Sequence, residues 1–352
     1  MNRKNLAILG GIATGTLVAG AAAGLGVFLT GRRIFNQLRD LRGDDIHGQS
    51  VLITGGSRGL GLALAEEFAR HGCRLILTAR DEAELQRARE QVQKAGVEVH
   101  TIVCDISRPD QVQHMVDEAT RQFGRIDILV NNAGIIAVGP LQSQTIEDFQ
   151  QAMDIMFWGT VHTTLAALPA MIERGRGRIV NISSIGGKVS IPHLLPYGCA
   201  KFAVTGFSEG LHAEVKKFGI HVLTVAPGLM RTGSHLKAEF KGKHEQEYGW
   251  FALGGTNPLM SVSAETAARQ IVAATRRNQA ELIVSWQAKV LAQAHGIAPG
   301  ITSEALALVN KLLPDARGAG VEKKTGRQSQ TTVTRSPLTM LGRRAALRYN
   351  QQ

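Results

Sequence analysis

The stretch VLITGGSRGLG, residues 51–61, decides the fold of this chain of 352 residues. A short apolar run is followed directly by glycines in the spacing GxxxGxG, at Gly55, Gly59 and Gly61, and then by a segment with helical periodicity. Glycines after a strand permit a tight turn, and the free N–H groups at the start of the next helix attract anions. The stretch therefore predicts a turn that binds the phosphates of a dinucleotide.

Short apolar segments and longer amphipathic segments alternate through residues 48–285. Continuous apolar segments of this length are typical of strands that helices cover on both faces. We expect strands at 51–54, 75–78, 99–104, 128–130, 178–182, 222–226 and 282–285, and helices at 60–71, 81–95, 109–123, 146–174, 200–218 and 264–277. The alternation predicts one α/β domain with a Rossmann-like, doubly wound parallel sheet.

A membrane anchor is expected in residues 1–47. Residues 5–31 carry no charged side chain, and as a helix they would cross a hydrocarbon core of about 30 Å. A cleaved signal peptide and a buried soluble helix are the alternatives. More Lys and Arg follow this run than precede it, so we expect a basic linker and a catalytic domain on the cytoplasmic side of a single-pass membrane protein.

The formal charge of +11 comes mostly from the two ends of the chain. Six Lys or Arg stand against three Asp in residues 1–47, and eight stand against one Glu in residues 316–352, which leaves +1 for residues 48–315. Cations outside the folded domain fit an anionic membrane surface better than a nucleic acid. We therefore expect a membrane and no nucleic acid as a partner.

Two segments follow the expected domain. Residues 286–315 keep an apolar helical period and are expected to form a helical extension, which could cover the active site, dock to a membrane or form a dimer contact. Residues 316–352 are basic and rich in Gly, Ser, Thr and Gln, so we expect a disordered tail.

The cysteines and histidines give no sign of a disulfide or a metal. Cys73, Cys104 and Cys199 have no paired spacing, and we expect buried, reduced thiols. Because no His, Cys and carboxylate cluster has the spacing of metal ligands, we expect no metal. Reduced thiols agree with a cytoplasmic domain.

Tyr197 and Lys201 form a YxxxK pair, which places both side chains on one face of a helix. A phenol titrates near pH 10 and is a poor proton donor or acceptor at neutrality. A nearby ammonium favours the phenolate and lowers its pKa. We therefore expect Tyr197 to exchange a proton with a substrate oxygen while hydride moves at a nicotinamide.

The GxxxGxG turn and the YxxxK pair together resemble the short-chain dehydrogenase/reductase family over residues 48–285. The resemblance implies that Ser184, 13 residues before Tyr197, is the catalytic serine that stabilises charge on the substrate oxygen. Ser183 is assigned a structural role. The catalytic residues are therefore expected to be Ser184, Tyr197 and Lys201.

The same resemblance implies a set of residues that hold the dinucleotide. Asp105 follows the third expected strand, an NNAG motif follows the fourth, and a PG motif follows the sixth. The expected cofactor-binding residues are Gly55, Ser57, Arg58, Gly59, Leu60, Gly61, Arg80, Asp105, Asn132, Ala133, Gly134, Tyr197, Lys201, Pro227, Gly228 and Thr232.

The charge at the end of the second expected strand favours NADP(H) over NAD(H). An acidic residue there would bind a ribose hydroxyl, whereas a cation favours the 2′-phosphate. Arg80 lies at this position and Arg58 lies inside the glycine turn, so two guanidinium groups could bracket the phosphate. The alternative is that Arg80 caps the strand and pairs with Asp81.

One residue departs from the family pattern. Met156 stands where the family usually has an asparagine that helps to hold a water in a proton relay to the lysine. Methionine cannot hold that water. The departure leaves open a relay through another group, slow turnover, or a catalytically idle dinucleotide-binding sensor or scaffold.

The expected substrate is a lipophilic carbonyl or alcohol of steroid-, retinoid- or lipid-like character. Residues 233–262 follow the PG motif as a substrate lid and carry Phe240, Tyr248, Trp250 and Phe251, which could face the substrate or pack against the lid's own core. No histidine has a partner evident from the sequence, so His193 is provisionally structural. The resemblance implies a homodimer through the helices at 146–174 and 200–218.

Overall fold

A parallel sheet of seven strands forms the centre of the domain, in the order β11-β7-β6-β4-β1-β2-β3. Every neighbouring pair is parallel. The strands are β1 Ser50–Thr54, β2 Arg74–Ala79, β3 Val99–Val103, β4 Ile128–Asn131, β6 Gly177–Ile182, β7 Ile220–Pro227 and β11 Glu281–Val284. The computed structural model describes residues 43–316, 320–332, 334 and 339–351, so the expected anchor at 5–31 lies outside the described residues.

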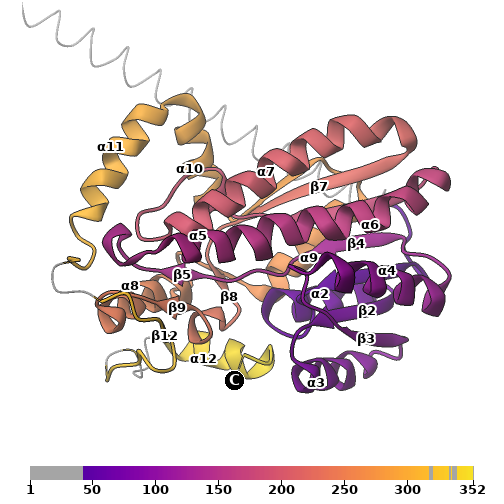
Figure 1. Ribbon diagram of the computed structural model, residues 1–352, viewed down its shortest axis with the longest axis horizontal. Coiled ribbons are helices and arrows are strands. Elements are labelled where there is room, and N and C mark those ends of the chain that lie inside the picture. The colour runs from indigo at the N-terminus through magenta and orange to yellow at the C-terminus, as the bar shows by residue number, and fades with distance from the viewer. Residues whose placement is uncertain (1–42, 317–319, 333, 335–338, 352) are drawn as a thin grey trace, which may run out of the picture. The chain divides into compact units, whose positions relative to one another are not determined.

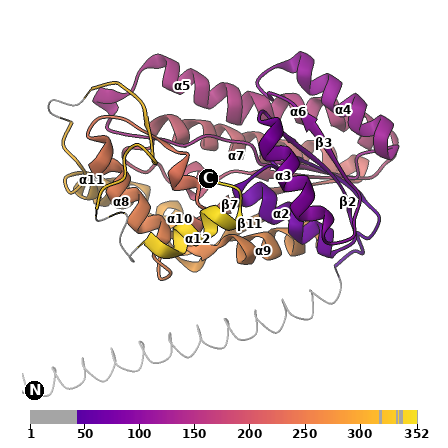
Figure 2. The ribbon, with the colours of Figure 1, turned by 90° about the horizontal axis from the view of Figure 1, so that it is seen from below.

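Helices cover both faces of the sheet (Figure 2). One face packs against α2 Gly59–Arg70, α3 Glu82–Gln93 and α9 Ala264–Arg276, and the other against α4 Pro109–Phe123, α6 Gly159–Glu173 and α7 Leu195–Val215. The strands β1 and β4 are fully buried, which explains their continuous apolar sequences. The Rossmann-like doubly wound sheet predicted from the sequence is confirmed.

The helix expected at 146–174 is divided by a wider turn. It consists of α5 Ile146–Ala152, a π-helical segment Met153–Trp158, and α6. π-Helical turns inside helices often occur at functional sites. Among the described residues this is the helix long and apolar enough to span a membrane, but half of it is buried inside the domain, where it serves as a core helix.

The lid lies between β8 Met230–Arg231 and β10 Val262–Ser263, and it contains β9 Glu239–Phe240 and α8 His244–Thr256. Strand β9 pairs with β5 Ala137–Val138 on one side. On its other side it pairs with β12 Lys324–Thr325, which belongs to the C-terminal segment. The lid strand β9 therefore lies between β5, which precedes it in the domain, and β12, which follows it by about 80 positions in the chain.

The expectation of a disordered tail at 316–352 is corrected by the described part of that segment. After β12 it forms α12 Met340–Arg348, which lies beside α8 (Figure 1). Ala346 and Tyr349 are buried at 2% exposure, and Lys323 bonds Asp148 at 3.1 Å. The segment is polar overall, but Ala346, Tyr349 and Lys323 have partners far away in the chain, which composition does not reveal.

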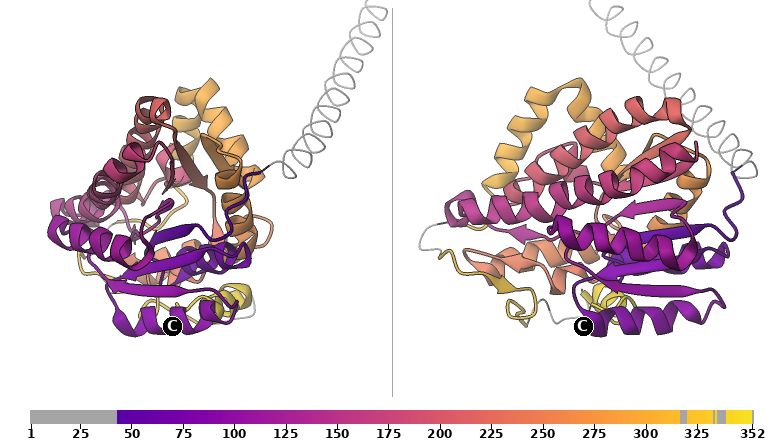
Figure 3. Two further views of the ribbon diagram at one scale, coloured as in Figure 1. Left: turned by 90° about the vertical axis from the view of Figure 1, so that its right-hand side faces the viewer. Right: turned by 45° about the vertical axis from the view of Figure 1, so that its right-hand side comes forward.

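Residues 286–310 form a helical hairpin of α10 Trp286–Ile297 and α11 Pro299–Asn310 beside the domain (Figure 3). The hairpin begins directly after β11, and the two helices pack against each other. Its apolar side chains are exposed, with Ile297 at 86% and Ile301 at 74%. Exposed apolar residues gathered in this way indicate a contact with a membrane or another protein.

The three cysteines do not share one environment. Burial raises the pKa of Cys73 to about 12 and that of Cys104 to about 11. Cys199 is exposed, which corrects the expectation of three buried thiols. It lies two residues from Tyr197 on α7, and a spacing of two turns a side chain away from the face that carries Tyr197.

Candidate active site

The glycine turn lies between β1 and α2. Gly55 and Gly59 have φ values of +63° and +58°, which side chains rarely adopt. A methyl group on Gly61 would lie 2.1 Å from the carbonyl oxygen of Gly55, so the helix can approach the turn only as glycine. The turn closes tightly on the N-terminus of α2, and the backbone N–H groups of a helix N-terminus suit a phosphate.

The NNAG motif braces this turn from β4. The side-chain Nδ2 of Asn132 donates to the carbonyl oxygens of Thr54 and Gly55 at 3.0 and 3.1 Å. Asn131 is buried and donates to Oδ1 of Asn181 on the next strand at 2.8 Å. The motif therefore ties three neighbouring strand ends together at the mouth of the site.

Ser184, Tyr197 and Lys201 come together where β6 meets α7. Tyr197 and Ser184 are joined by a side-chain hydrogen bond. The Nζ atom of Lys201 donates to the carbonyl oxygen of Ile182 at 2.7 Å and lies 5.9 Å from the centre of the Tyr197 ring. Ser183 bonds Thr205 and the Lys201 carbonyl on α7, so its hydroxyl fastens β6 to the helix.

Burial sets the protonation of this group. It raises the pKa of Tyr197 above its usual value, although the hydrogen bond with Ser184 acts in the opposite direction. Burial also lowers the pKa of Lys201 to about 8. The sequence led us to expect that the ammonium would lower the pKa of the phenol. In this structure the pKa of Tyr197 is instead raised, mainly by burial, so Tyr197 holds its proton at neutral pH.

One cavity of about 710 Å³ joins the glycine turn to Tyr197, a volume in the usual range of ligand pockets. The predicted residues that line it are Gly55, Ser57, Arg58, Gly59, Leu60, Arg80, Asp105, Asn132, Ala133, Gly134, Ser184, Tyr197, Lys201, Pro227, Gly228 and Thr232. Gly61 lies behind the turn instead. A dinucleotide fits this arrangement, because glycine at 55 and 61 lets the turn fold tightly: a methyl group would lie 2.9 Å from Cα of Ala133 at Gly55 and 2.1 Å from the Gly55 carbonyl oxygen at Gly61.

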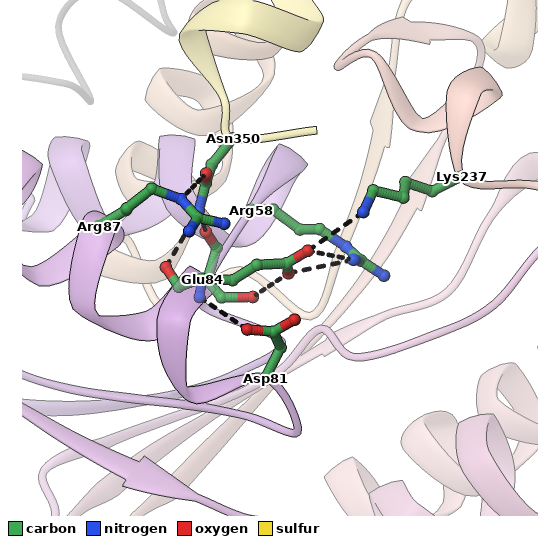
Figure 4. Close-up of polar contacts among 7 residues, drawn as sticks. Arg58, Asp81, Glu84, Arg87, Lys237 and Asn350 are labelled. Carbon is green, nitrogen blue, oxygen red and sulfur yellow. Dashed lines mark hydrogen bonds and ion pairs between the residues drawn. The ribbon is translucent and has the colours of Figure 1, made fainter. Parts of the chain in front are cut away.

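Four charged residues meet at the rim beside the turn (Figure 4). Nη1 of Arg58 donates to both carboxylate oxygens of Glu84, at 2.9 and 3.0 Å. Lys237 of the lid bonds the same carboxylate at 3.3 Å, and Ser57 Oγ also donates to it at 3.3 Å. Asp81 caps α3 by accepting from the Glu84 backbone N–H. The sequence did not single out Glu84 or Lys237, because neither belongs to a local motif.

Met156 lies in the π-helical segment and is buried next to the catalytic group. A methyl group on Gly134 would lie 3.4 Å from its sulfur and 3.8 Å from Nζ of Lys201. The position that the family pattern gives to an asparagine is therefore beside Lys201 in this chain. A thioether there offers Lys201 only a weak acceptor.

The lid aromatics pack against one another. Phe240, Tyr248, Trp250 and Phe251 belong to one cluster within the lid, with ring centres 5.3 to 5.7 Å apart. Of the two expectations for these residues, the structure bears out the internal core. The apolar lining of the cavity comes instead from Ile135, Ile136, Ile155 and Met230.

His193 has a partner that the sequence did not reveal. Its Nδ1 atom lies 2.9 Å from Glu247 of α8, and Glu247 is fully buried. Trp250 Nε1 donates to the same carboxylate at 2.8 Å. His193 has a φ of +62°, so this contact holds the loop before Tyr197 in a strained conformation against the lid.

The cavity lies at the carboxyl ends of the parallel strands, where doubly wound sheets bind dinucleotides, so fold and site together define an oxidoreductase of the Rossmann type. Residues 49–241 match the family described as short chain dehydrogenase. The chain belongs to this family, whose members are oxidoreductases that act on alcohols and carbonyls with a nicotinamide dinucleotide. The family resemblance drawn from the sequence motifs is confirmed.

Similar proteins include a steroid enzyme and structures with either dinucleotide. The 11-beta-hydroxysteroid dehydrogenase A of Sesamum indicum is 35% identical over 249 residues, covering 69% of this chain and 70% of that protein. The structure of L-sorbose reductase from Gluconobacter frateurii with NADPH and L-sorbose has a TM-score of 0.61 at 28% identity, covering 68% of this chain and 95% of that one. A short chain dehydrogenase from Mycobacterium paratuberculosis bound to NAD has a TM-score of 0.61 at 29% identity, covering 68% and 97%. This chain spans 62% of the length of another curated relative.

Proposed function

We propose that this protein is an NADP(H)-dependent dehydrogenase or reductase that acts on a lipophilic carbonyl or alcohol. The observation that carries the proposal is that Ser184, Tyr197 and Lys201 line the same cavity as the glycine turn. A bound nicotinamide dinucleotide supplies or accepts the hydride. Among the described residues, no three His, Cys, Asp or Glu side chains form a group that could hold a metal ion.

The protonation of the catalytic group supports carbonyl reduction. Tyr197 keeps its proton at neutral pH, so its hydroxyl can donate that proton to the substrate oxygen. Ser184 bonds Tyr197 and can hold the same oxygen, which stabilises the charge that develops there. Lys201, with a pKa of about 8, can return a proton to the phenol near neutral pH.

The cations at the rim support NADP(H). Arg58, Arg80 and Lys237 line the cavity with the carboxylates of Asp81 and Glu84, which leaves an excess of one positive charge. Nη1 of Arg58 donates to both carboxylate oxygens of Glu84, so a guanidinium at this rim already bonds an anionic group, and a phosphate is another anion that it can bond. Arg80 is the second cation of the proposed 2′-phosphate site.

Titration of the purified full chain with NADPH and NADH, followed by nicotinamide fluorescence, tests the cofactor assignment. We expect NADPH to bind at least about tenfold more tightly, and Arg80→Ala to remove most of that preference. Arg108→Ala is the matched control, because Arg108 is exposed at the N-cap of α4 and pairs with Asp110. Equal affinity of the wild type for both dinucleotides would contradict the NADP(H) assignment.

A lipophilic substrate is supported by the lining of the cavity and by one relative. Ile135, Ile136 and Ile155 face the cavity near Tyr197, where an apolar substrate body would be buried. The sesame relative is named for a steroid substrate. We expect NADPH oxidation with steroid-, retinoid- or lipid-like carbonyls and little with polar sugars. Oxidation of NADPH only with polar carbonyls would reject this class.

We also propose a membrane location, with the catalytic domain on the cytoplasmic side. The uncharged run at 5–31 is long enough to span a bilayer, and the exposed hairpin of α10 and α11 offers a second apolar contact. Fractionation of cells that express the full chain should place it in the membrane pellet at high salt and release it only with detergent. A chain that is soluble at low salt would reject the anchor.

Met156 supports a second candidate, a catalytically weak dinucleotide-binding sensor or scaffold. Its thioether stands beside Lys201, where it cannot order a water as an amide can. This candidate predicts tight dinucleotide binding with no carbonyl-dependent NADPH oxidation across a broad substrate panel. Turnover with any member of the panel would favour the enzyme.

A further inference from the structure

The segment after α12 is fastened to the glycine turn. The backbone N–H of Gly59 donates to the carbonyl oxygen of Tyr349 at 2.8 Å. Nδ2 of Asn350 donates to the carbonyl oxygen of Ser57 at 3.0 Å, and its Oδ1 accepts from Arg87 at 2.8 Å (Figure 4). The last described residues therefore bond directly to the turn that was predicted to bind phosphate.

This contact is anchored in the core of the domain. Tyr349 is 2% exposed and belongs to the same apolar cluster as β1, α2 and α9. Arg348 forms an ion pair with Glu265 of α9, and its carbonyl oxygen accepts from Gln91 of α3 at 3.1 Å. The helices α2, α3 and α9 thus hold the segment in place, and with it the residue that follows Asn350.

That next residue, Gln351, faces the cavity with an unused polar atom. Its side chain lines the cavity and is only 5% exposed. Its Oε1 atom is buried and has no hydrogen-bond partner within the part of the chain that the structure describes. Its Nε2 atom packs so closely on the turn that a methyl group on Gly59 would lie 2.6 Å from it. A buried amide left in this state indicates a group that bonds a ligand.

The position of the amide indicates which part of a ligand it meets. The first N–H of α2, that of Gly59, donates to the carbonyl oxygen of Tyr349. The side-chain N–H₂ of Gln351 lies beside Gly59 and offers another donor at this point. Thr232, which was expected to lie near the nicotinamide or a phosphate, is also close to this point, with its Cβ atom 3.9 Å from the same hypothetical methyl group. The turn and the N-terminus of α2 are the part of this fold that binds the diphosphate of a dinucleotide, so the Gln351 amide would lie next to that group.

We propose that Gln351 binds the diphosphate of the nicotinamide dinucleotide, so that the C-terminal segment is part of the cofactor site. The inference rests on the proposed function. The amide nitrogen donates to a phosphate oxygen beside the helix N-terminus, and the amide oxygen accepts from a ribose hydroxyl next to that phosphate. Because NADPH and NADH share the diphosphate and the ribose, Gln351 contributes to the affinity for both and not to the choice between them.

The test uses the full chain with Gln351→Met, which keeps the length of the side chain and removes its hydrogen bonds. We expect the Kd to rise about tenfold for NADPH and by the same factor for NADH, as for the loss of a bond to a charged group. Gln113→Met, at an exposed position on α4, is the matched control and should leave both Kd values unchanged. Thermal melting without ligand shows whether each variant is folded.

A second variant separates the ligand bond from the fastening of the segment. Asn350→Ala removes the bonds to Ser57, Glu84 and Arg87, and we expect it to weaken binding by allowing Gln351 to leave the cavity. The double variant should then bind the dinucleotide no more weakly than the weaker-binding single variant, because both substitutions act through the Gln351 amide.

The outcomes distinguish the inference from the proposed function. A wild type that binds neither dinucleotide overturns both. A wild type that binds, with Gln351→Met unchanged in Kd while folded, overturns the role of Gln351 alone. Tighter binding by Gln351→Met also overturns it, because the segment would then obstruct the site.

Discussion

The two walls of the cavity are built in different ways. The first wall consists of the glycine turn, the strand ends and α7, and its contacts join residues of short, recognisable motifs. The second wall consists of the lid and the C-terminal segment, and its contacts join residues far apart, such as Lys237 to Glu84 and Asn350 to Ser57. In the proposed function the first wall carries the catalytic group, and the second wall closes the cavity with contacts that no short motif records.

A pair of tyrosine variants tests this division most strongly. Tyr197→Phe in the first wall removes the proton donor and should lower kcat/KM by about 10³. Tyr248→Phe in the second wall also loses one hydroxyl, but Tyr248 packs inside the lid, so kcat/KM should stay within about a factor of three. Both values come from NADPH oxidation with the best carbonyl of the panel. Comparable losses in the two variants would show that the walls are not separable in this way.

The first wall should also carry a cost in stability that depends on pH. Burial lowers the pKa of Lys201 to about 8 from 10.5, so between these pH values the unfolded chain binds more protons than the folded one, and stability rises with pH. Lys201→Met removes this cost, so the variant should gain unfolding free energy relative to the wild type at pH 7. That gain should shrink by on the order of 3 kcal/mol from pH 7 to pH 10.5.

Lys188 gives the opposite sign and serves as the control for that measurement. Glu209 and Glu281 raise the pKa of Lys188 despite burial, so its stabilisation is present below pH 10.5 and is lost as the pH rises through the higher folded value. Lys188→Met should therefore be destabilising at pH 7. Denaturant melts of both variants across this range measure how the unfolding free energy changes with pH. Equal pH dependence in the two variants would contradict the destabilisation of the Lys201 ammonium by burial.

The second wall can be disturbed without touching the first. Gly233 has a φ of +82°, and a methyl group there would lie 2.4 Å from the Cα atom of Ala346 on α12. Gly233→Ala should destabilise the domain by about 2 kcal/mol and speed amide hydrogen exchange in α12. Gly249→Ala, where a methyl group meets nothing within 4 Å, should be neutral or stabilising. Unchanged exchange in α12 would mean that the segment does not depend on this contact.

The same division explains what the sequence could and could not predict. The glycine turn, the NNAG motif and the pair Tyr197 and Lys201 are each local in the sequence, so spacing and the family resemblance could predict them, and the structure gathers them in one cavity. The partners His193 and Glu247 are 54 residues apart, and Lys237 and Glu84 are 153 apart. Pairs of this kind depend on how the lid folds back, and no periodicity records that.

The C-terminal segment was misread for a related physical reason. Composition counts how many apolar residues a segment has, and this one has few. It does not show that Tyr349 and Ala346 each find a buried place prepared by other elements. A few well-placed side chains with ion pairs on either side, such as Arg348 with Glu265, are enough to order a polar segment on an existing surface.

The contact between Asn350 and Ser57 also has a consequence for the time at which the site is finished during synthesis. The two residues are 293 positions apart in the chain. At about 5–20 residues per second, the ribosome needs roughly 15 to 60 s to make the residues between them. The glycine turn can fold early in that interval, but it gains its C-terminal cover only at the end, so a nascent chain holds an open turn for most of its synthesis.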